Sequence, residues 1–454
     1  MSWFDKLKTS MSRRSTPSVY TFDTDLNLGE GPRREGPNLK RSAAPFPSFQ
    51  ATAGDQLEAR TRDGMSGVRM RLRNAFTPSQ PITDWSRFAG RTEMLTQLIR
   101  ATEDGRLHTV LYGERGIGKT SILHVFAQAA RNARYLVSYV SCGAGSDFDE
   151  MFRAVADDIP LLYHGSYGPT SPEAERGATF ASLLPEGEIS VRQASDLCAK
   201  ITGTRVLIIL DEFDRVESRA LRRSVAEFLK NLSDRSVRVQ LIIAGVAANL
   251  TELVEHVPSI QRNVFALEAA PLSEAETRLL VKTGETSSGV IFEEDATRFI
   301  VAVSNGLPYL ASLTSHLAGL KAIDDGRTVV TREDVAAGSA AALAELLGRI
   351  SKRSQSQIAM CVQQGAHLLL GPLAGTAQLT GGVFDQSVLK SLWPDSDRAA
   401  KARSLVDRLA TQNVLLQVQE DESGRRYRFV ESSVPPYLWL LAARDSFIES
   451  EDSL

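Results

Sequence analysis

Residues 113–120 read Gly-Glu-Arg-Gly-Ile-Gly-Lys-Thr, a complete G-x-x-x-x-G-K-[ST] pattern. The apolar run Leu107–Tyr112 precedes it, and an apolar pattern with helical spacing follows at Ser121–Ala130. A phosphate-binding loop needs this context, because its glycines let backbone N–H groups curl around phosphates at the positive N-terminal end of a helix. The sequence therefore predicts a bound nucleoside triphosphate.

Each position of this loop has an expected role. Lys119 should reach the β- and γ-phosphates, and the Thr120 hydroxyl should hold Mg²⁺. The remaining loop positions and the residue after them are expected to contact ATP: Gly113, Glu114, Arg115, Gly116, Ile117, Gly118 and Ser121.

Two carboxylates follow the most apolar segment of the chain, Val206–Leu210. A continuous apolar run is typical of a central parallel strand, and ligands of such sheets bind at the carboxyl ends of the strands. Asp211 is therefore the expected Mg²⁺ ligand, directly or through water. Glu212 is the expected group that orients and deprotonates the attacking water.

Strand and helix patterns alternate between residues 85 and 270. Strands are expected at 107–112, 135–140, 206–210, 238–244 and 264–267, with helices between them. The Gly- and Pro-rich stretch 159–190 is expected to be an irregular insertion. This alternation predicts an α/β fold, a doubly wound parallel sheet, and with the phosphate loop it makes 85–270 the expected P-loop ATPase core.

Three further regions flank this core. Residues 1–84 are dense in Pro, Gly, Ser and Arg, which favours a mostly disordered arm, although 67–76 could form a short basic helix or strand that docks on the core or on nucleic acid. Strands disappear after Pro271, so 271–347 should be a helical lid with capping-box helix starts. Residues 350–448 show helices followed by a hairpin, which resembles a winged helix.

The whole chain sets limits on function. Its 454 residues suit two to four domains, and a net charge of −3 excludes wholesale coating by nucleic acid while leaving room for a local basic surface. Cys142, Cys198 and Cys361 are far apart, which indicates neither a disulfide framework nor a zinc site. No apolar stretch approaches the roughly 18 residues of a membrane span. A cytoplasmic protein without a transmembrane segment is expected.

The phosphate loop together with Asp211 and Glu212 resembles the AAA+ ATPases and their STAND relatives. The layout, ending in a winged helix, is similar to origin-recognition-type initiators and archaeal-type ATPases, and the resemblance covers about residues 86–445. Gly90-Arg-Thr-Glu93 looks like the Gly-Arg box of these domains, with its glutamate one place early. Leu210–Arg215 is similar to their second nucleotide motif.

The resemblance implies three more site residues. Arg262 stands where the family has an arginine finger that completes a neighbouring subunit's site; a solvated surface arginine is the alternative. Asn249 is the candidate for a polar group that positions water, although its neighbours 246–248 are apolar and a helix N-cap is an equal alternative. Pro308, in Asn305-Gly-Leu-Pro-Tyr309, resembles the G-x-P lid element whose proline abuts adenine; the alternative is a helix-helix turn.

Three functions follow from these expectations. In the first, ATP controls the assembly of a homo-oligomer on duplex DNA, bound through cations of the winged helix. These cations are Arg398, Lys401, Arg403, Arg408, Arg425, Arg426 and Arg428. Nearby acidic residues make a solvated charged face the alternative.

In the second, the protein is a STAND-like signalling or defence switch whose winged helix packs on the nucleotide domain as a regulatory module without DNA. The absence of a lid arginine near Pro308 favours this hypothesis. In the third, the N-terminal arm binds a protein partner and the nucleotide is mainly structural, which the intact Lys119, Asp211 and Glu212 argue against.

Overall fold

The computed structural model describes residues 64–168, 170–247, 262–394, 396–421 and 424–449. All of them fall in one compact unit, Gly54–Leu454. The expected helix at 249–256, with Asn249, lies outside the described residues, as does most of the expected arm. None of the helices in the described part of the chain has the length and apolarity that crossing a membrane requires.

A five-stranded parallel sheet organises the first half of the described chain, with strand order β2-β3-β4-β1-β5. The strands are β1 (His108–Tyr112), β2 (Leu136–Ser141), β3 (Val206–Asp211), β4 (Val239–Gly245) and β5 (Val264–Glu268). All residues of β3 and β4 are buried, as expected for central parallel strands. The carboxyl ends of β1 and β3 therefore lie at one edge, with β4 between them.

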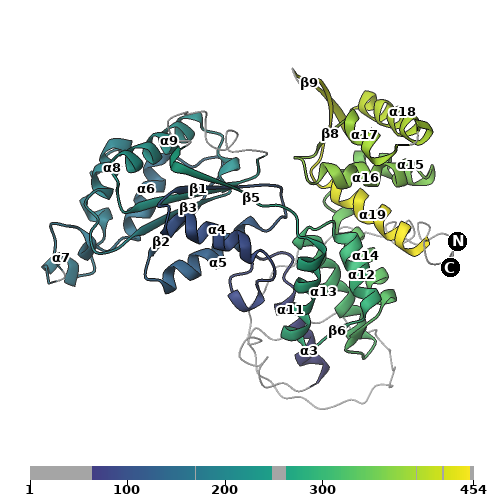
Figure 1. Ribbon diagram of the computed structural model, residues 1–454, viewed down its shortest axis with the longest axis horizontal. Helices are drawn as coiled ribbons and strands as arrows, with labels where there is room; N and C mark the ends of the chain where they lie inside the picture. The colour runs from purple at the N-terminus through teal and green to yellow at the C-terminus, as the bar shows by residue number, and fades with distance from the viewer. Residues whose placement is uncertain (1–63, 169, 248–261, 395, 422–423, 450–454) are drawn as a thin grey trace, which may run out of the picture. The chain divides into compact units, whose positions relative to one another are not determined.

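Helices cover both faces of this sheet (Figure 1). One face packs against α4 and α5 and the other against α6, α8 and α9. These helices are α4 (Thr92–Glu103), α5 (Lys119–Asn132), α6 (Phe148–Asp157), α8 (Val191–Cys198) and α9 (Arg219–Asp234). Leu207 and Ile209 face the first layer, whereas Ile208 and Leu210 face the second. The predicted α/β fold with a doubly wound parallel sheet is confirmed.

The expected irregular insertion carries only short elements. They are the 3-10 helices Leu161–Tyr163 and Phe180–Leu183 and the one-turn helix α7 (Pro172–Glu175). Isolated bridges join Pro160 to Thr179 and His164 to Ile201, so the insertion is fastened to itself and to the segment before β3.

The lid consists of four helices and one small sheet. The helices are α11 (Glu274–Ser288), α12 (Glu294–Ser304), α13 (Pro308–Asp324) and α14 (Arg332–Leu347). The capping boxes expected at Ser273 and Thr331 are both present. The expectation that strands disappear after Pro271 is wrong, because β6 (Ile291–Phe292) and β7 (Val329–Val330) pair in parallel and satisfy each other's backbone groups.

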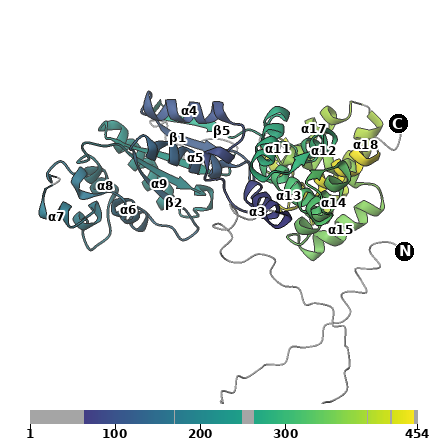
Figure 2. The ribbon, with the colours of Figure 1, turned by 90° about the horizontal axis from the view of Figure 1, so that it is seen from below.

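The described chain begins before Trp85, where the sequence analysis expects order to start. Helix α3 (Met65–Ala75) packs against α11 and α13, as two views of the ribbon show (Figures 1 and 2). Its side chains Met70 and Leu72 are buried there. Helix α3 therefore forms where the sequence left open a short docking helix at 67–76, and it packs on the lid because burying apolar side chains stabilises this position.

Two glycines of the lid make room for this segment. A Cβ at Gly284 of α11 would lie 2.0 Å from the ring of Phe76, and a Cβ at Gly319 of α13 would lie 2.8 Å from Leu72. No side chain larger than hydrogen fits at either position without displacing its neighbour. Phe76 and Leu72 thus occupy notches that these glycines leave in the lid.

We expect Phe76→Ala to lower the free energy of unfolding by about 3–5 kcal/mol, because removing a buried ring leaves a cavity. The ring is 1% exposed. Leu279→Ala, at an exposed position of α11, should change this free energy by less than about 0.5 kcal/mol. Denaturant unfolding of both variants measures the difference. Equal effects of the two substitutions would contradict the docking of α3 on the lid.

The C-terminal unit combines five helices with a three-stranded antiparallel sheet of order β8-β10-β9. Its elements are α15 (Lys352–Gln363), α16 (His367–Ala377), β8 (Val383–Asp385), α17 (Gln386–Leu392), α18 (Ser396–Gln412), β9 (Leu416–Asp421), β10 (Gly424–Phe429) and α19 (Val434–Glu449). A turn at Gly365, whose φ is 68°, separates α15 from α16. Strand β8 adds to the expected hairpin.

Helix α19 joins the lid to the C-terminal unit. It packs on α16 and also on α12 and α14 of the lid. The Trp439 indole N–H donates to the carbonyl oxygen of Val303 at 3.0 Å, and the rings of Phe299 and Phe447 stack with centroids 4.3 Å apart. A movement of the lid would therefore be transmitted to the C-terminal unit through these contacts.

Candidate nucleotide site

The predicted phosphate loop joins β1 to α5. Gly113, Gly116 and Gly118 have φ values of 142°, 79° and 92°, a region that other residues rarely adopt. A Cβ at Gly113 would also lie 2.8 Å from the carbonyl oxygen of Ala269, which precludes any side chain there. The glycines of the motif thus set the path of the loop to the N-terminus of α5.

Lys119 is the first residue of α5 and is 8% exposed. Its ammonium donates to the carbonyl oxygens of Gly113 and Glu114, each at 2.8 Å. Burial lowers the pKa of Lys119 to about 8, and the nearby carboxylates of Asp214, Glu114 and Asp211 only partly oppose this. An anion in the site would favour the charged form of this amine.

Asp211 ends β3 and is 4% exposed. Its Oδ2 accepts a hydrogen bond from the Tyr139 hydroxyl at 2.6 Å, and its Oδ1 accepts one from the backbone N–H of Glu212 at 2.8 Å. Both carboxylate oxygens are therefore fixed by a donor. This geometry leaves each oxygen a second lone pair for another partner.

Glu212 is in a different environment, although it is the next residue. Its backbone has a φ of 55°, and its side chain is 45% exposed. The carboxylate accepts from Arg215 Nη1 at 2.7 Å and from the Ser141 hydroxyl at 3.4 Å. The two neighbouring carboxylates thus divide into one that is buried and fixed and one that is accessible from solvent.

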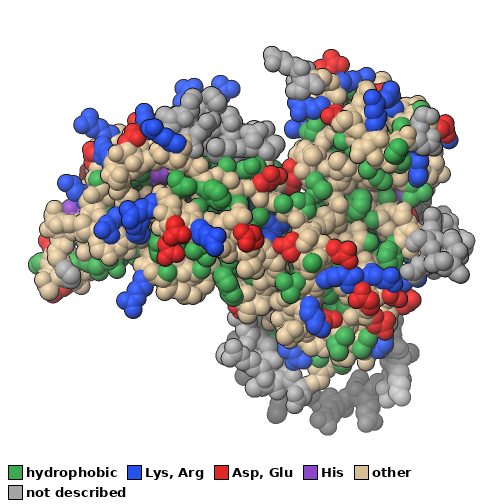
Figure 3. Space-filling model, in the orientation of Figure 1, with side chains coloured by type: hydrophobic (Ala, Val, Ile, Leu, Met, Phe, Trp, Pro, Cys, Tyr) green, Lys and Arg blue, Asp and Glu red, His purple; other side chains and the backbone are tan. Residues whose placement is uncertain are grey.

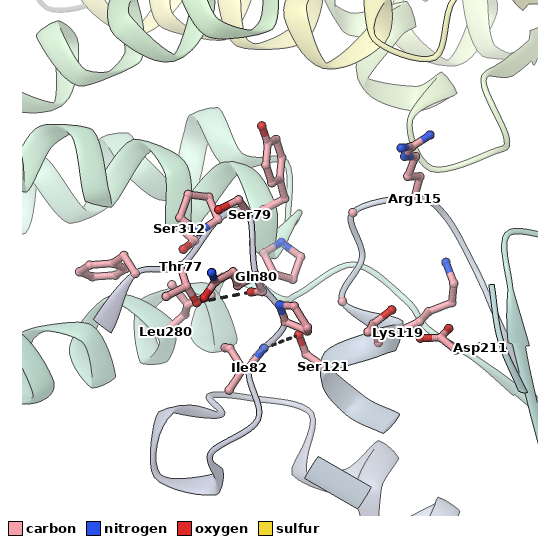
Figure 4. A pocket seen from close by; sticks show the side chains of 18 of the residues that line it. Thr77, Ser79, Gln80, Ile82, Arg115, Lys119, Ser121, Asp211, Leu280 and Ser312 are labelled. Carbon is pink, nitrogen blue, oxygen red and sulfur yellow. Dashed lines mark hydrogen bonds between the residues drawn. The ribbon is translucent and has the colours of Figure 1, made fainter. Parts of the chain in front are cut away.

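A cavity of about 650 Å³ lies between the phosphate loop, the end of β3 and the lid. Most predicted site residues line it: Arg115, Gly116, Gly118, Lys119, Thr120, Ser121, Asp211, Glu212 and Pro308. In the close view Lys119 lies beside Asp211, and Arg115 extends away from both (Figure 4). Three predicted residues, Gly113, Glu114 and Ile117, instead line a second cavity of about 420 Å³.

The lid element that contains Pro308 meets the phosphate loop. A Cβ at Gly118 would contact Pro308 at 3.8 Å, and one at Gly116 would contact Tyr309 at 3.6 Å. Gly306, with a φ of 69°, approaches the Leu272 backbone so closely that a Cβ would lie 2.5 Å from its carbonyl oxygen. The element is held over the loop, and the contact of Pro308 with adenine stays a prediction.

Of the two remaining predicted residues, the structure describes only Arg262. Arg262 is exposed immediately before β5 and is not one of the described residues that line the cavity. Its role as an arginine finger for a neighbouring subunit stays a prediction. Asn249 lies outside the described residues, so its role stays a prediction too.

One wall of the cavity was not predicted from the sequence. Residues 75–82 line it on the side of the lid, together with Leu280 and Ser312 (Figure 4). The backbone N–H of Ile82 donates to the Ser121 hydroxyl at 3.1 Å, which ties this segment to the first turn of α5. Only its Pro residues mark it in the sequence, and they give no hint of its position.

A second unpredicted contact joins the Gly-Arg box to the lid. The backbone N–H of Arg91 donates to Glu276 Oε1 at 2.9 Å, and Arg91 Nη2 donates to the carbonyl oxygen of Ala270 at 2.6 Å. Burial lowers the pKa of Arg91 to about 10. Glu276 therefore caps α11 and also accepts a hydrogen bond from the Gly-Arg box.

The residues around the cavity fit Mg²⁺ bound together with a nucleotide. Thr120 and Asp211 offer a hydroxyl and a carboxylate on its wall. Mg²⁺ prefers oxygen ligands and is usually held by one or two protein groups plus phosphates. These two residues would supply the protein ligands.

Comparison with known proteins finds one family model that matches part of the chain. Residues 101–254 match the family model described as an AAA domain. A comparison with curated proteins finds no match.

Three similar solved structures are as follows. The RuvB Holliday junction branch migration motor of Thermotoga maritima is 13% identical, covers 80% of this chain and 97% of its own, and has a TM-score of 0.40. Cdc6p of Pyrobaculum aerophilum is 15% identical, with 84% and 98% covered and a TM-score of 0.44. The Walker-type ATPase of Pyrococcus abyssi is 16% identical, with 80% and 99% covered and a TM-score of 0.46. Residues 101–254 of this chain thus match an AAA domain, and the phosphate loop joins a strand of the five-stranded parallel sheet to the helix that follows it.

Proposed function

We propose that this protein binds and hydrolyses ATP with Mg²⁺ in the cavity between the phosphate loop and the lid. The observation that carries the proposal is that Lys119, Asp211, Glu212 and Pro308 line one cavity. The triphosphate requires a cation, and Mg²⁺ requires a buried carboxylate. The attacking water requires an accessible carboxylate, and the adenine ring requires an apolar surface. Bound Mg²⁺ would neutralise charge that develops on the phosphates.

Each residue has a part in this reaction. Lys119 would exchange its two backbone carbonyl partners for phosphate oxygens, and Thr120 and Asp211 would hold Mg²⁺. Glu212 would take a proton from the attacking water. Arg215 Nη1 and the Ser141 hydroxyl both donate to Oε2 of Glu212, so Oε1 could take this proton while the ion pair stays in place.

We further propose that the nucleotide state controls partner binding through the C-terminal unit. The Asn305 side-chain amide donates to the carbonyl oxygen of Gly375 at 2.9 Å and to Gln378 Oε1 at 3.1 Å, both in or next to α16. Asn305 stands three residues before Pro308, in the same turn of the lid. If that turn shifts when nucleotide binds, these two hydrogen bonds would transmit the movement to the C-terminal unit.

Duplex DNA is the partner we propose, with the C-terminal unit as a winged helix. Lys and Arg side chains lie over α18 and the β8–β10 sheet, with Asp and Glu among them (Figure 3). The exposed cations of this surface are Arg398, Lys401, Arg403, Arg408, Arg425 and Arg428. Arg425 also pairs with Asp407 at 3.4 Å and Lys401 with Asp397 at 2.8 Å, which reduces the local positive field.

The STAND-like switch is the second candidate, and one observation favours it. The cavity of about 420 Å³ has Gly113 and Glu114 of the phosphate loop on one side and Phe384, Asp385 and Arg426 of the C-terminal unit on the other. A C-terminal unit that faces the phosphate loop could sense the nucleotide itself. It would then act as a regulatory module without DNA.

One experiment separates the two candidates. We expect duplex DNA to bind and to stimulate the ATPase rate, with affinity that falls steeply with salt because counterions are released from the phosphates. Replacing Arg398 and Arg403 by Glu should reduce the salt slope by about 2, since each phosphate contact contributes about 0.9. Fluorescence anisotropy across a salt series measures this slope.

The control exchanges Arg176 and Arg192 for Glu, since both are exposed cations of the AAA domain. This variant should bind DNA with the wild-type slope. Absence of DNA binding even at about 50 mM salt would reject DNA as the partner and favour the switch.

A further inference from the structure

The Asp211 carboxylate is held by a tyrosine from the edge of the sheet. Tyr139 lies on β2, one strand away, and its hydroxyl donates to Asp211 Oδ2 at 2.6 Å. The second oxygen, Oδ1, accepts from the backbone N–H of Glu212. With both oxygens bound, the carboxylate cannot rotate without breaking a hydrogen bond in a buried place.

Tyr139 is itself held in position by the helix that begins in the phosphate loop. Its ring stacks on His124 of α5, with centroids 4.6 Å apart and planes 2° from parallel. Tyr139, His124 and Asp211 all lie on the face of the sheet that α5 covers. The stack thus fixes the hydroxyl relative to the same helix that carries Lys119 and Thr120.

Burial, and then the negative charge of Asp211, raise the pKa of Tyr139 well above its usual value. Burial also lowers the pKa of His124.

We propose that Tyr139 is a positioning residue for the Mg²⁺-nucleotide complex, because its hydroxyl orients the Asp211 carboxylate so that the free lone pairs face the cation. This inference rests on the proposed function of the site. Groups that donate a hydrogen bond to a metal-binding side chain fix the orientation of that side chain. Their loss typically weakens metal binding by about 10–100-fold. The ring alone could pack against His124 equally well as phenylalanine, so only the hydroxyl carries this role.

Tyr139→Phe tests the role, because it keeps the ring and removes the hydrogen bond. We expect the affinity for Mn²⁺, used as the probe for Mg²⁺, to fall about 10–100-fold in the complex of the full chain with ADP. Electron paramagnetic resonance titration measures free Mn²⁺ directly and does not depend on turnover. Binding of a fluorescent ADP analogue in the presence of EDTA should be unchanged.

Tyr427→Phe is the matched control. The Tyr427 hydroxyl also donates to a carboxylate, Asp407 Oδ1 at 2.7 Å, but in the C-terminal unit. This variant loses an equivalent hydrogen bond and should keep wild-type Mn²⁺ affinity.

Saturating Mg²⁺ distinguishes positioning from a folding defect. If Tyr139 only orients the Mg²⁺ ligand, excess Mg²⁺ should restore the ATPase rate of Tyr139→Phe, whereas a misfolded site would stay inactive. Wild-type Mn²⁺ affinity in Tyr139→Phe, or a rate that excess Mg²⁺ does not restore, would overturn the inference. Failure of the unmodified protein to bind nucleotide would instead overturn the proposed function.

Discussion

Lys119→Ala should weaken ATP binding about 100-fold, because the variant loses hydrogen bonds from a charged donor to phosphate worth about 3 kcal/mol. The ammonium is buried at the start of α5, beside the carbonyl oxygens of the phosphate loop. Arg115 of the same loop extends away from it and so is not placed to replace it (Figure 4). Titration with a fluorescent ATP analogue measures the affinity.

The pH dependence of binding gives the same prediction a second readout. Burial holds the pKa of Lys119 at about 8 in the free protein, and a bound triphosphate would raise it. Affinity should therefore be greatest below pH 8 and fall as the pH rises above it, because binding then requires uptake of a proton. The Lys119→Ala variant should lack this fall.

Lys230→Ala is the control for this substitution, since Lys230 is an exposed lysine of α9 in the same domain. It should bind ATP with wild-type affinity at every pH. Equal affinity of Lys119→Ala and the unmodified protein would contradict the assignment of the phosphate loop.

Glu212→Gln should keep ATP binding and reduce the rate of hydrolysis by about 100–10,000-fold, the usual contribution of a positioned general base. Glutamine has the shape of glutamate but cannot take a proton from water. Its amide can still meet the Ser141 hydroxyl, although the ion pair with Arg215 is lost. Phosphate release under saturating ATP measures the rate, and the binding titration verifies that the site is intact.

Asp214→Asn is the matched control for the base. Asp214 also lines the cavity, but its Oδ1 accepts the backbone N–H of Val246 at 2.9 Å, which indicates a structural part. We expect this variant to hydrolyse ATP within about tenfold of the wild-type rate, because no proton transfer depends on it. Normal hydrolysis by Glu212→Gln together with a large loss in Asp214→Asn would assign the base to Asp214.

The sequence predicted the fold class because the signals for it are local. The spacing of Gly113, Gly118 and Lys119 sets a loop between strand and helix, and the apolar run Val206–Leu210 indicates a central strand. Each expected strand of the sheet falls within two residues of its observed bounds. The sequence did not predict short strand pairings such as that of β6 with β7. Each of these strands has two residues, which is too few to show a periodic pattern.

The candidate site was predicted in part for the same reason. Lys119, Thr120, Asp211 and Glu212 belong to short motifs, and the structure brings all four to one cavity. Tyr139 belongs to no motif. It meets Asp211 across 72 positions of the chain, and nothing near it in the sequence distinguishes it from the other apolar residues of β2.

By itself the sequence determined the phosphate loop, the two carboxylates and the alternation that gives a parallel sheet. Only the tertiary structure decided that Tyr139 binds Asp211, that Phe76 lies in the notch at Gly284, and that Asn305 bonds to α16. The reason is physical: backbone conformation and apolar periodicity depend on neighbouring residues, whereas contacts between distant side chains depend on how whole elements pack. Motifs therefore identify the residues proposed to bind the nucleotide, and packing decides which distant side chains contact them.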